Sequence, residues 1–97
     1  MWIDELDGFA WDEHNVGHIS RHEVTPREVE EAARRPALIV PAQPRGGEQR
    51  WKLLGKTTAG WYLVVVFTVR QNKFRAVTAH TMNASERRLY GPQIDQA

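Results

Sequence analysis

The sequence contains no cysteine, which excludes two classes of site. Without thiols there is no disulfide framework and no thiolate-bound zinc. The P-loop, GxSxG, HExxH and GxGxxG patterns are also missing, so the signatures of phosphate-binding loops, serine hydrolases, zinc proteases and dinucleotide-binding folds do not occur. The longest apolar run, residues 61–69, is far too short for a membrane-spanning helix. No basic segment followed by an apolar one opens the chain, so we expect a cytoplasmic protein.

The composition is that of an ordinary soluble globular protein. The 97 residues are 41% apolar and 26% charged, which supports one modest hydrophobic core and does not indicate disorder. We expect a single domain over residues 1–97, with its core at about 9–90 and peripheral ends at 1–8 and 91–97.

Charge is distributed unevenly along the chain. Residues 1–31 hold nine acidic and two basic side chains, a net charge of −7, whereas residues 32–97 hold eleven basic and three acidic ones, a net charge of +8. If the halves stay apart in space, the basic one suits a polyanion or an acidic partner. The alternative is that the two halves neutralise each other through salt bridges on a solvated surface.

Residues 61–69 predict the central strand of a sheet. Both alternating sets of side chains in this run are apolar, so the strand needs cover on both faces. A second strand is predicted at 50–56, where Arg50, Lys52 and Lys56 alternate with an apolar set. Tight hairpins at 57–60 and 71–73 connect these strands to each other and to a strand at 74–81.

Two helices are predicted before the sheet. The first covers about 12–22, with Asp12 as N-cap after a short strand at 9–11. The second begins after Thr25, which forms a capping box with Glu28, and it ends before Pro36.

The remaining elements complete an α+β fold. We expect a short strand at 37–40, a loop at 41–49 and a frayed tail at 93–97. A helix is expected at 84–90, with Asn83 as N-cap and Glu86 three residues later, and it is stopped by Gly91 and Pro92. The sequence therefore predicts a small antiparallel sheet with two N-terminal helices packed on one face and a short C-terminal helix. The opposite face would carry the basic side chains of 50–56.

Basic and aromatic residues recur together on the predicted sheet. Such side chains can hold phosphates and stack on unpaired bases, as in single-stranded RNA binding; a merely solvated sheet face is the alternative. The residues of this set are Arg50, Lys52, Lys56, Trp51, Trp61, Tyr62, Arg70, Lys73 and Arg75.

The histidines offer two further kinds of site. His80 lies at the end of the last strand and could act as an acid or base in cleavage assisted by the 2′-hydroxyl, or could be a hydrogen-bonded structural residue. His14, His18 and His22 recur every four residues and share a helix face, which could chelate a metal, although packing and capping roles are the alternative. No third ligand from elsewhere is evident, so we expect no metal site and no cofactor.

Taken in order, several of these motifs resemble the BrnT toxins of type II toxin–antitoxin systems over residues 9–90. The matching residues are Trp11-Asp12-Glu13, His18-Ile19, the run 21–32 (RHEVTPREVEEA), Arg50, Gly55-Lys56-Thr57, Gly60, Thr78-Ala79 and the run 86–90 (ERRLY). The resemblance implies a RelE-like fold and a metal-independent ribonuclease that blocks translation. It also implies a cognate antitoxin, usually with a ribbon-helix-helix DNA-binding part, and an oligomer could form in that complex.

The residue roles follow partly from the resemblance, which puts Arg50, Lys56 and Glu86 on motif positions near the active surface. The expected catalytic set is Arg50, Lys56, Arg75, His80 and Glu86. The expected RNA-binding set is Lys52, Trp61, Arg70, Lys73, Arg87 and Tyr90.

Two departures from the family pattern affect this assignment. Thr78-Ala79-His80 stands where the family usually has Ser/Thr-Ala-Arg, and the first-helix pattern is one residue shorter, with Asn15 and His18 near positions more often Lys and Asn. Replacing an arginine by histidine removes a permanent cation. The sequence is thus compatible with a retuned nuclease, or with a catalytically silent module of the same fold that binds RNA or protein.

Overall fold

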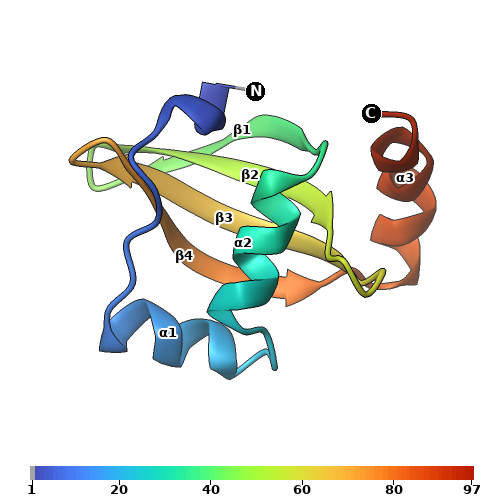
Figure 1. Ribbon diagram of the computed structural model, residues 1–97, viewed down its shortest axis with the longest axis horizontal. Helices are drawn as coiled ribbons and strands as arrows, with labels where there is room; N and C mark the ends of the chain where they lie inside the picture. The colour runs from blue at the N-terminus through green and yellow to red at the C-terminus, as the bar shows by residue number, and fades with distance from the viewer. Residues whose placement is uncertain (1) are drawn as a thin grey trace.

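The computed structural model describes residues 2–97 as a four-stranded antiparallel sheet with helices packed on both faces (Figure 1). In chain order the elements are η1 (Trp2–Glu5), α1 (Glu13–Ser20), α2 (Pro26–Arg34), β1 (Leu38–Arg45), β2 (Glu48–Lys56), β3 (Tyr62–Arg70), β4 (Lys73–Thr81) and α3 (Ala84–Asp95). The predicted α+β class is confirmed. None of these helices is long and apolar enough to cross a membrane.

The strands follow one another in the order β1-β2-β3-β4. The strand predicted at 61–69 is therefore an inner strand, paired on both sides and covered on both faces. The register of β3 against β4 shifts between Val66 and Phe67, so that Val66 pairs with Thr78 but Phe67 pairs with Ala76. Val77 is left over as a bulge, a feature that bends a strand and re-aims its side chains.

The main core lies between the sheet and the N-terminal helices. In Figure 1, α2 crosses one face of the sheet and α1 lies beside β4. Phe67 of β3 and Phe74 of β4 stack there, with ring centroids 4.2 Å apart. The fully or almost fully buried side chains of this core are Ile3, Ile19, Val24, Val29, Ala32, Ala33, Leu53, Leu63, Val65, Phe67, Phe74, Ala76 and Ala79.

The predicted helix starts are confirmed. Asp12 caps α1, accepting hydrogen bonds from the backbone N–H groups of His14 and Asn15. Thr25 and Glu28 form the predicted capping box at the start of α2, and Asn83 and Glu86 form another at the start of α3. Each cap satisfies N–H groups that the first turn of a helix leaves without partners.

Two predictions at the start of the sheet were wrong. Residues 9–11 form no strand, only an isolated parallel bridge between Phe9 and Phe74. The strand predicted at 37–40 extends through the expected loop to Arg45, and Pro41 and Pro44 lie within it. β1 is an edge strand that pairs only with β2. A proline nitrogen on the unpaired side of such a strand removes no hydrogen bond from the sheet.

The predicted end of the last helix was also wrong. α3 continues through Gly91 and Pro92 to Asp95, so 93–97 is not a frayed tail. Ile94 is buried in a second, smaller cluster with Leu54 and Val64, on the sheet face opposite α2. Burial of this apolar side chain outweighs the local signal to stop, since tertiary packing overrides helix propensity.

Candidate functional site

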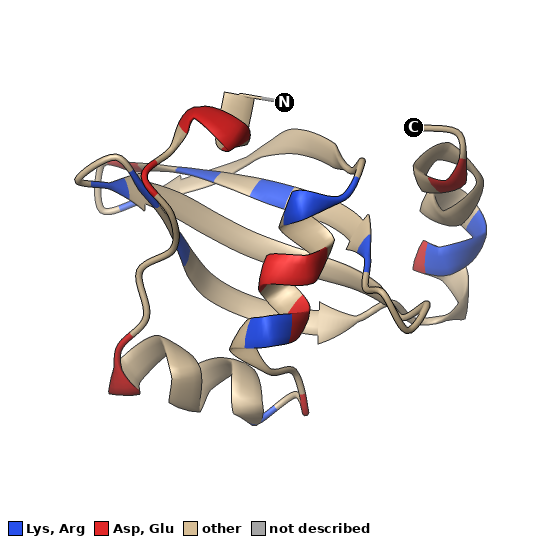
Figure 2. Cartoon of the chain, viewed as in Figure 1, with Lys and Arg blue, Asp and Glu red and all other residues tan. Residues whose placement is uncertain are grey.

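Basic side chains of three strands meet at one end of the sheet face opposite α2, away from α3. Arg75 of β4 is the cross-strand partner of Thr68 in β3. Arg50 of β2 lies one position beyond the Trp51–Phe67 pair, which places it in the same row across the sheet. Figure 2 shows Lys and Arg segments at the end of the sheet that carries the β3–β4 turn, and further basic segments along β2 toward its opposite end.

A cleft of about 330 Å³ opens where these strands face α1. We call it the arginine cleft. Its lining residues are His14, Asn15 and His18 of α1, with Arg45, Glu48, Arg50, Arg70, Arg75, Ala76 and Val77 of the sheet. Of the expected site residues, Arg50, Arg70 and Arg75 are thus brought together.

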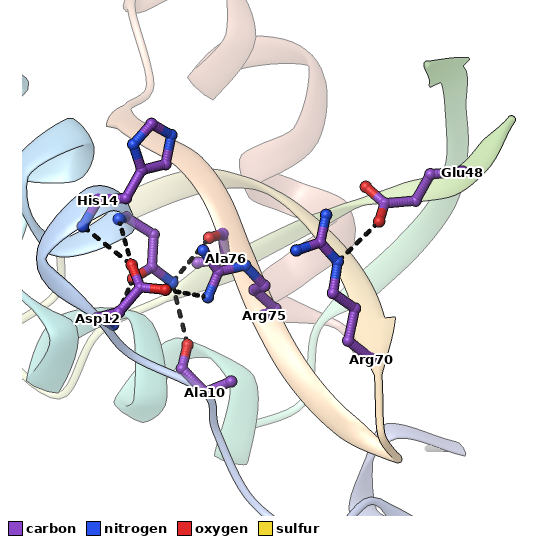
Figure 3. Close-up of polar contacts among 8 residues, drawn as sticks. Ala10, Asp12, His14, Glu48, Arg70, Arg75 and Ala76 are labelled. Carbon is purple, nitrogen blue, oxygen red and sulfur yellow. Dashed lines mark hydrogen bonds and ion pairs between the residues drawn. The ribbon is translucent and has the colours of Figure 1, made fainter. Parts of the chain in front are cut away.

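Carboxylates hold the cleft arginines in place. Glu48 Oε2 lies 2.8 Å from Arg70 Nε, and its other oxygen lies 3.7 Å from Arg50 Nε. Arg75 Nη1 lies 2.9 Å from Asp12 Oδ2 (Figure 3). The hydrogen bond from Arg70 lowers the pKa of Glu48, and the hydrogen bond from Arg75, with the N–H of Asn15, lowers the pKa of Asp12.

Arg50 and Arg75 are the most enclosed of these cations, with side chains only 20% and 15% exposed. The Nε atom of Arg50 is buried and has no hydrogen-bond partner within the described residues. A buried donor without an acceptor is costly, and the Glu48 carboxylate oxygen opposite it lies at 3.7 Å, too far for a hydrogen bond. The fixed guanidinium groups suit the oxygens of a phosphate better than lysines would.

Asn15 attaches α1 to the edge of the sheet. Its amide Nδ2 donates to the carbonyl oxygens of Ala10 and Ala76, both at 3.0 Å, and its Oδ1 accepts from Asp12 N at 2.8 Å. The side chain is almost fully buried. This attachment brings His14 and His18, one turn apart, to the rim of the arginine cleft.

Sequence reasoning missed several residues of this cleft. Glu48 and Arg45 fell in a predicted loop, and Asn15 was noted only as a departure from the family pattern. The four-residue spacing of the histidines is a usable signal for His14 and His18, although by itself it suggests only packing and capping roles or, as the alternative, a metal motif. Among residues 2–97, no group of three or more His, Asp or Glu side chains is arranged to hold a metal ion.

His80 and Glu86 form a separate pair farther along the same sheet face. His80 Nε2 lies 3.3 Å from each carboxylate oxygen of Glu86. The backbone N–H of Asn83 makes the largest contribution to lowering the pKa of Glu86, and His80 and Lys52 add to it. The His80 side chain is 42% exposed and so remains accessible.

Lys56 belongs to a third group, which holds α3 against the sheet. Its Nζ lies 3.0 Å from Asp95 Oδ1, and Tyr62 donates to the same carboxylate at 2.9 Å. The hydrogen bond to Asp95 raises the pKa of Lys56. Arg87 lies over the Tyr62 ring, 4.8 Å from its centroid, and Tyr90 packs beside the small core cluster.

The expected catalytic residues therefore do not converge on one point. Arg75 and His80 are five residues apart on β4, which corresponds to roughly 16 Å at about 3.3 Å per strand residue. Lys56 lies farther still, at the opposite end of β2 from Arg50. One phosphate cannot contact all of these groups. Trp61 is 59% exposed in the β2–β3 turn, and Lys73 is exposed beside the β3–β4 turn.

The chain was compared with models of protein families and with curated proteins. A family model described as "Ribonuclease toxin, BrnT, of type II toxin-antitoxin system" matches residues 11–86. The matched segment contains every residue that lines the arginine cleft. The comparison with curated proteins gave no match.

Proposed function

The chain belongs to the BrnT family of ribonuclease toxins of type II toxin–antitoxin systems, and we propose that it cleaves RNA in the arginine cleft. The observation that supports this most directly is the meeting of Arg50, Arg70 and Arg75, from three different strands, in one cleft. The proposal extends to the family's biological setting, in which RNA cleavage blocks translation and a cognate antitoxin, with a ribbon-helix-helix part, neutralises the toxin.

The arginines would bind the scissile phosphate and stabilise the charge that develops on it. Guanidinium groups donate several hydrogen bonds in a fixed plane and stay protonated throughout the reaction. Donors that are already positioned gain most when charge appears in the transition state. On entry, the phosphate would take over donors that now face Glu48 and Asp12, two carboxylates that offset only part of the positive charge of the empty cleft.

The nucleophile would be the 2′-hydroxyl of the RNA itself. Its oxygen forms a bond to phosphorus, its proton passes to a base, the bond from phosphorus to the 5′-oxygen breaks, and an acid protonates that oxygen. This yields a 2′,3′-cyclic phosphate and a 5′-hydroxyl. Groups of the cleft that can exchange protons are Glu48, His14 and His18.

His80 is the second candidate for proton transfer. It is accessible and paired with Glu86, but the length of β4 between it and Arg75 puts it beyond a phosphate bound in the cleft. In that arrangement His80 and Lys52 would contact a neighbouring part of the same RNA strand. Variants of His80 and of the cleft therefore separate the two assignments.

The test is cleavage of unstructured RNA by purified wild type and by Arg50→Gln, Glu48→Gln and His80→Ala variants. Arg27→Ala is the matched control, because the Arg27 side chain is 89% exposed on α2 and does not line the cleft. Loss of one charge-stabilising donor typically lowers the rate by about 10²–10³. We therefore expect the cleavage rate of Arg50→Gln to fall by this factor and that of Arg27→Ala to equal the wild-type rate.

Two outcomes would contradict the proposal. Wild-type rates in Arg50→Gln and Glu48→Gln, together with a large loss in His80→Ala, would move the chemistry to the His80–Glu86 pair. A folded wild type that binds RNA in a salt-dependent manner without releasing product would identify a silent binding module.

A further inference from the structure

A second hollow adjoins the arginine cleft along the edge of β4. It has a volume of about 730 Å³ and is lined by Phe9, Ala10, Trp11, Asp12, Arg70, Gln71, Lys73 and Arg75. We call it the β4-edge groove. Arg70 and Arg75 line both hollows, so a chain bound in one can continue into the other across these two side chains.

One wall of the groove is the segment that leads into α1. This segment is fixed to β4 by the hydrogen bonds from Phe74 N to Gly8 O, at 2.9 Å, and from Ala10 N to Phe74 O, at 2.8 Å. Trp11 donates its indole N–H to Glu30 Oε2 at 2.9 Å, which orients a half-buried ring beside the groove. The wall is therefore preformed, and Trp11, which also packs against the main core, is part of its lining.

The other wall is the β3–β4 turn. Gln71 and Asn72 adopt left-handed backbone conformations, with φ of 53° and 61°, as in a tight hairpin turn. The turn leaves the side chains of Gln71 and Lys73 exposed. An amide that can donate and accept thus stands beside an exposed cation at the outer end of the groove.

We propose that the β4-edge groove binds the nucleotide next to the scissile phosphate, and that the substrate is single-stranded RNA that enters past the β3–β4 turn. This inference rests on the proposed function. Arg70 and Lys73 are cross-strand partners beside the turn, and Arg75 lies two residues farther along β4, so these cations would contact neighbouring phosphates. The Trp11 ring would stack on a base and Gln71 would contact its edge, which requires the base to be unpaired.

The volume and charge of the groove fit this occupant. Sites for small ligands commonly measure about 300–1,000 Å³, a range that includes this groove. Its cations are Arg70, Lys73 and Arg75, and the one carboxylate in its lining, Asp12, is paired with Arg75. A strand of RNA is the occupant that makes use of both the shared arginines and the exposed lysine.

The experiment measures binding of 2′-O-methyl RNA oligonucleotides of one, two and four nucleotides, each with a 5′-phosphate. These probes lack the nucleophile, so binding is observed without cleavage. The test variant is Lys73→Ala combined with Gln71→Gly, because glycine accepts the left-handed conformation at position 71. Arg27→Ala is the control for loss of one exposed positive charge.

In wild type, affinity should rise at least tenfold from the mononucleotide to the tetranucleotide. The double variant should lose about tenfold in tetranucleotide affinity, and its salt dependence should fall by about 0.7 in log–log slope for one lost phosphate contact. Mononucleotide binding, which needs only the arginine cleft, should be unchanged. Binding should quench tryptophan fluorescence less in Trp11→Phe than in wild type.

Equal tetranucleotide affinity and equal salt slope in the double variant and wild type would overturn the groove assignment. Equal affinity of wild type for one and four nucleotides would overturn it as well. If the length dependence holds but unmodified RNA is never cut, the groove stands and the proposed ribonuclease activity fails.

Discussion

Asp12 joins the start of α1 to an arginine of the cleft. Its Oδ1 accepts from the backbone N–H groups of His14 and Asn15, at 2.9 and 3.1 Å, while its Oδ2 lies 2.9 Å from Arg75 Nη1. One carboxylate thus caps a helix and positions a cation, so the placement of α1 and of Arg75 are coupled.

Replacing Asp12 by asparagine separates these two roles. Asparagine caps helices about as well as aspartate, but it removes the negative charge that faces Arg75. We expect Asp12→Asn to bind 2′-O-methyl RNA several-fold more tightly than wild type, with a steeper salt dependence, measured by fluorescence titration. Asp12→Ala is the companion variant and should lose about 1 kcal/mol of stability with the cap. Weaker RNA binding by Asp12→Asn would mean that the carboxylate is needed to aim Arg75.

Stability at acid pH should depend on this ion pair. The pKa of Asp12 is lowered from 3.8 in the folded protein, so the unfolded state binds its proton more readily. The stabilisation from the ionised carboxylate is therefore complete above about pH 5, and it is lost as the pH falls below 4 through the folded-state pKa. We expect Asp12→Asn to lose less stability than wild type between pH 5 and pH 3, measured by urea unfolding. When Arg75 is replaced by glutamine, Asp12→Asn should change the acid-induced loss of stability less, since the hydrogen bond from Arg75 is the main cause of the lowered Asp12 pKa.

Two glycine-to-alanine substitutions should have opposite effects. A Cβ at Gly55 would lie 3.1 Å from the carbonyl oxygen of Ala32 and 3.3 Å from the Cβ of Ala37. Gly55→Ala should therefore cost about 1–3 kcal/mol, because α2 must move away from β2. Gly17 lies in α1 with open space around it and no positive φ, so Gly17→Ala should add about 0.5–1 kcal/mol. Thermal unfolding measures both, and a stabilised Gly55→Ala would show that the contact with α2 is easily relieved.

The buried end of α3 predicts a large effect at a position that the sequence assigned to a frayed tail. Ile94 is only 4% exposed and packs with Leu54 and Val64, so Ile94→Ala should cost about 2 kcal/mol or more. Gln93→Ala, one residue earlier on the exposed side of the helix, should change stability by less than about 0.5 kcal/mol. Chemical denaturation of the pair checks this, and equal stabilities would show that α3 contributes little to the fold.

The sequence by itself determined the features that depend on neighbouring residues. The caps at Asp12, Thr25 and Asn83 are hydrogen bonds over two or three positions, and the two hairpin turns use residues that adopt them locally. The inner strand was also readable, because a run that is apolar on both faces has to be covered on both.

Only the tertiary structure decided how the candidate site is assembled. The register of three strands, with the bulge at Val77, sets Arg50, Arg70 and Arg75 together and leaves His80 with Glu86. The extent of α3 depends on an apolar surface offered by Leu54 and Val64. The approach of His14 and His18 depends on Asn15 reaching a carbonyl of β4, 61 residues away in sequence. These contacts join residues that are distant along the chain, and no local pattern specifies which distant residue each one meets.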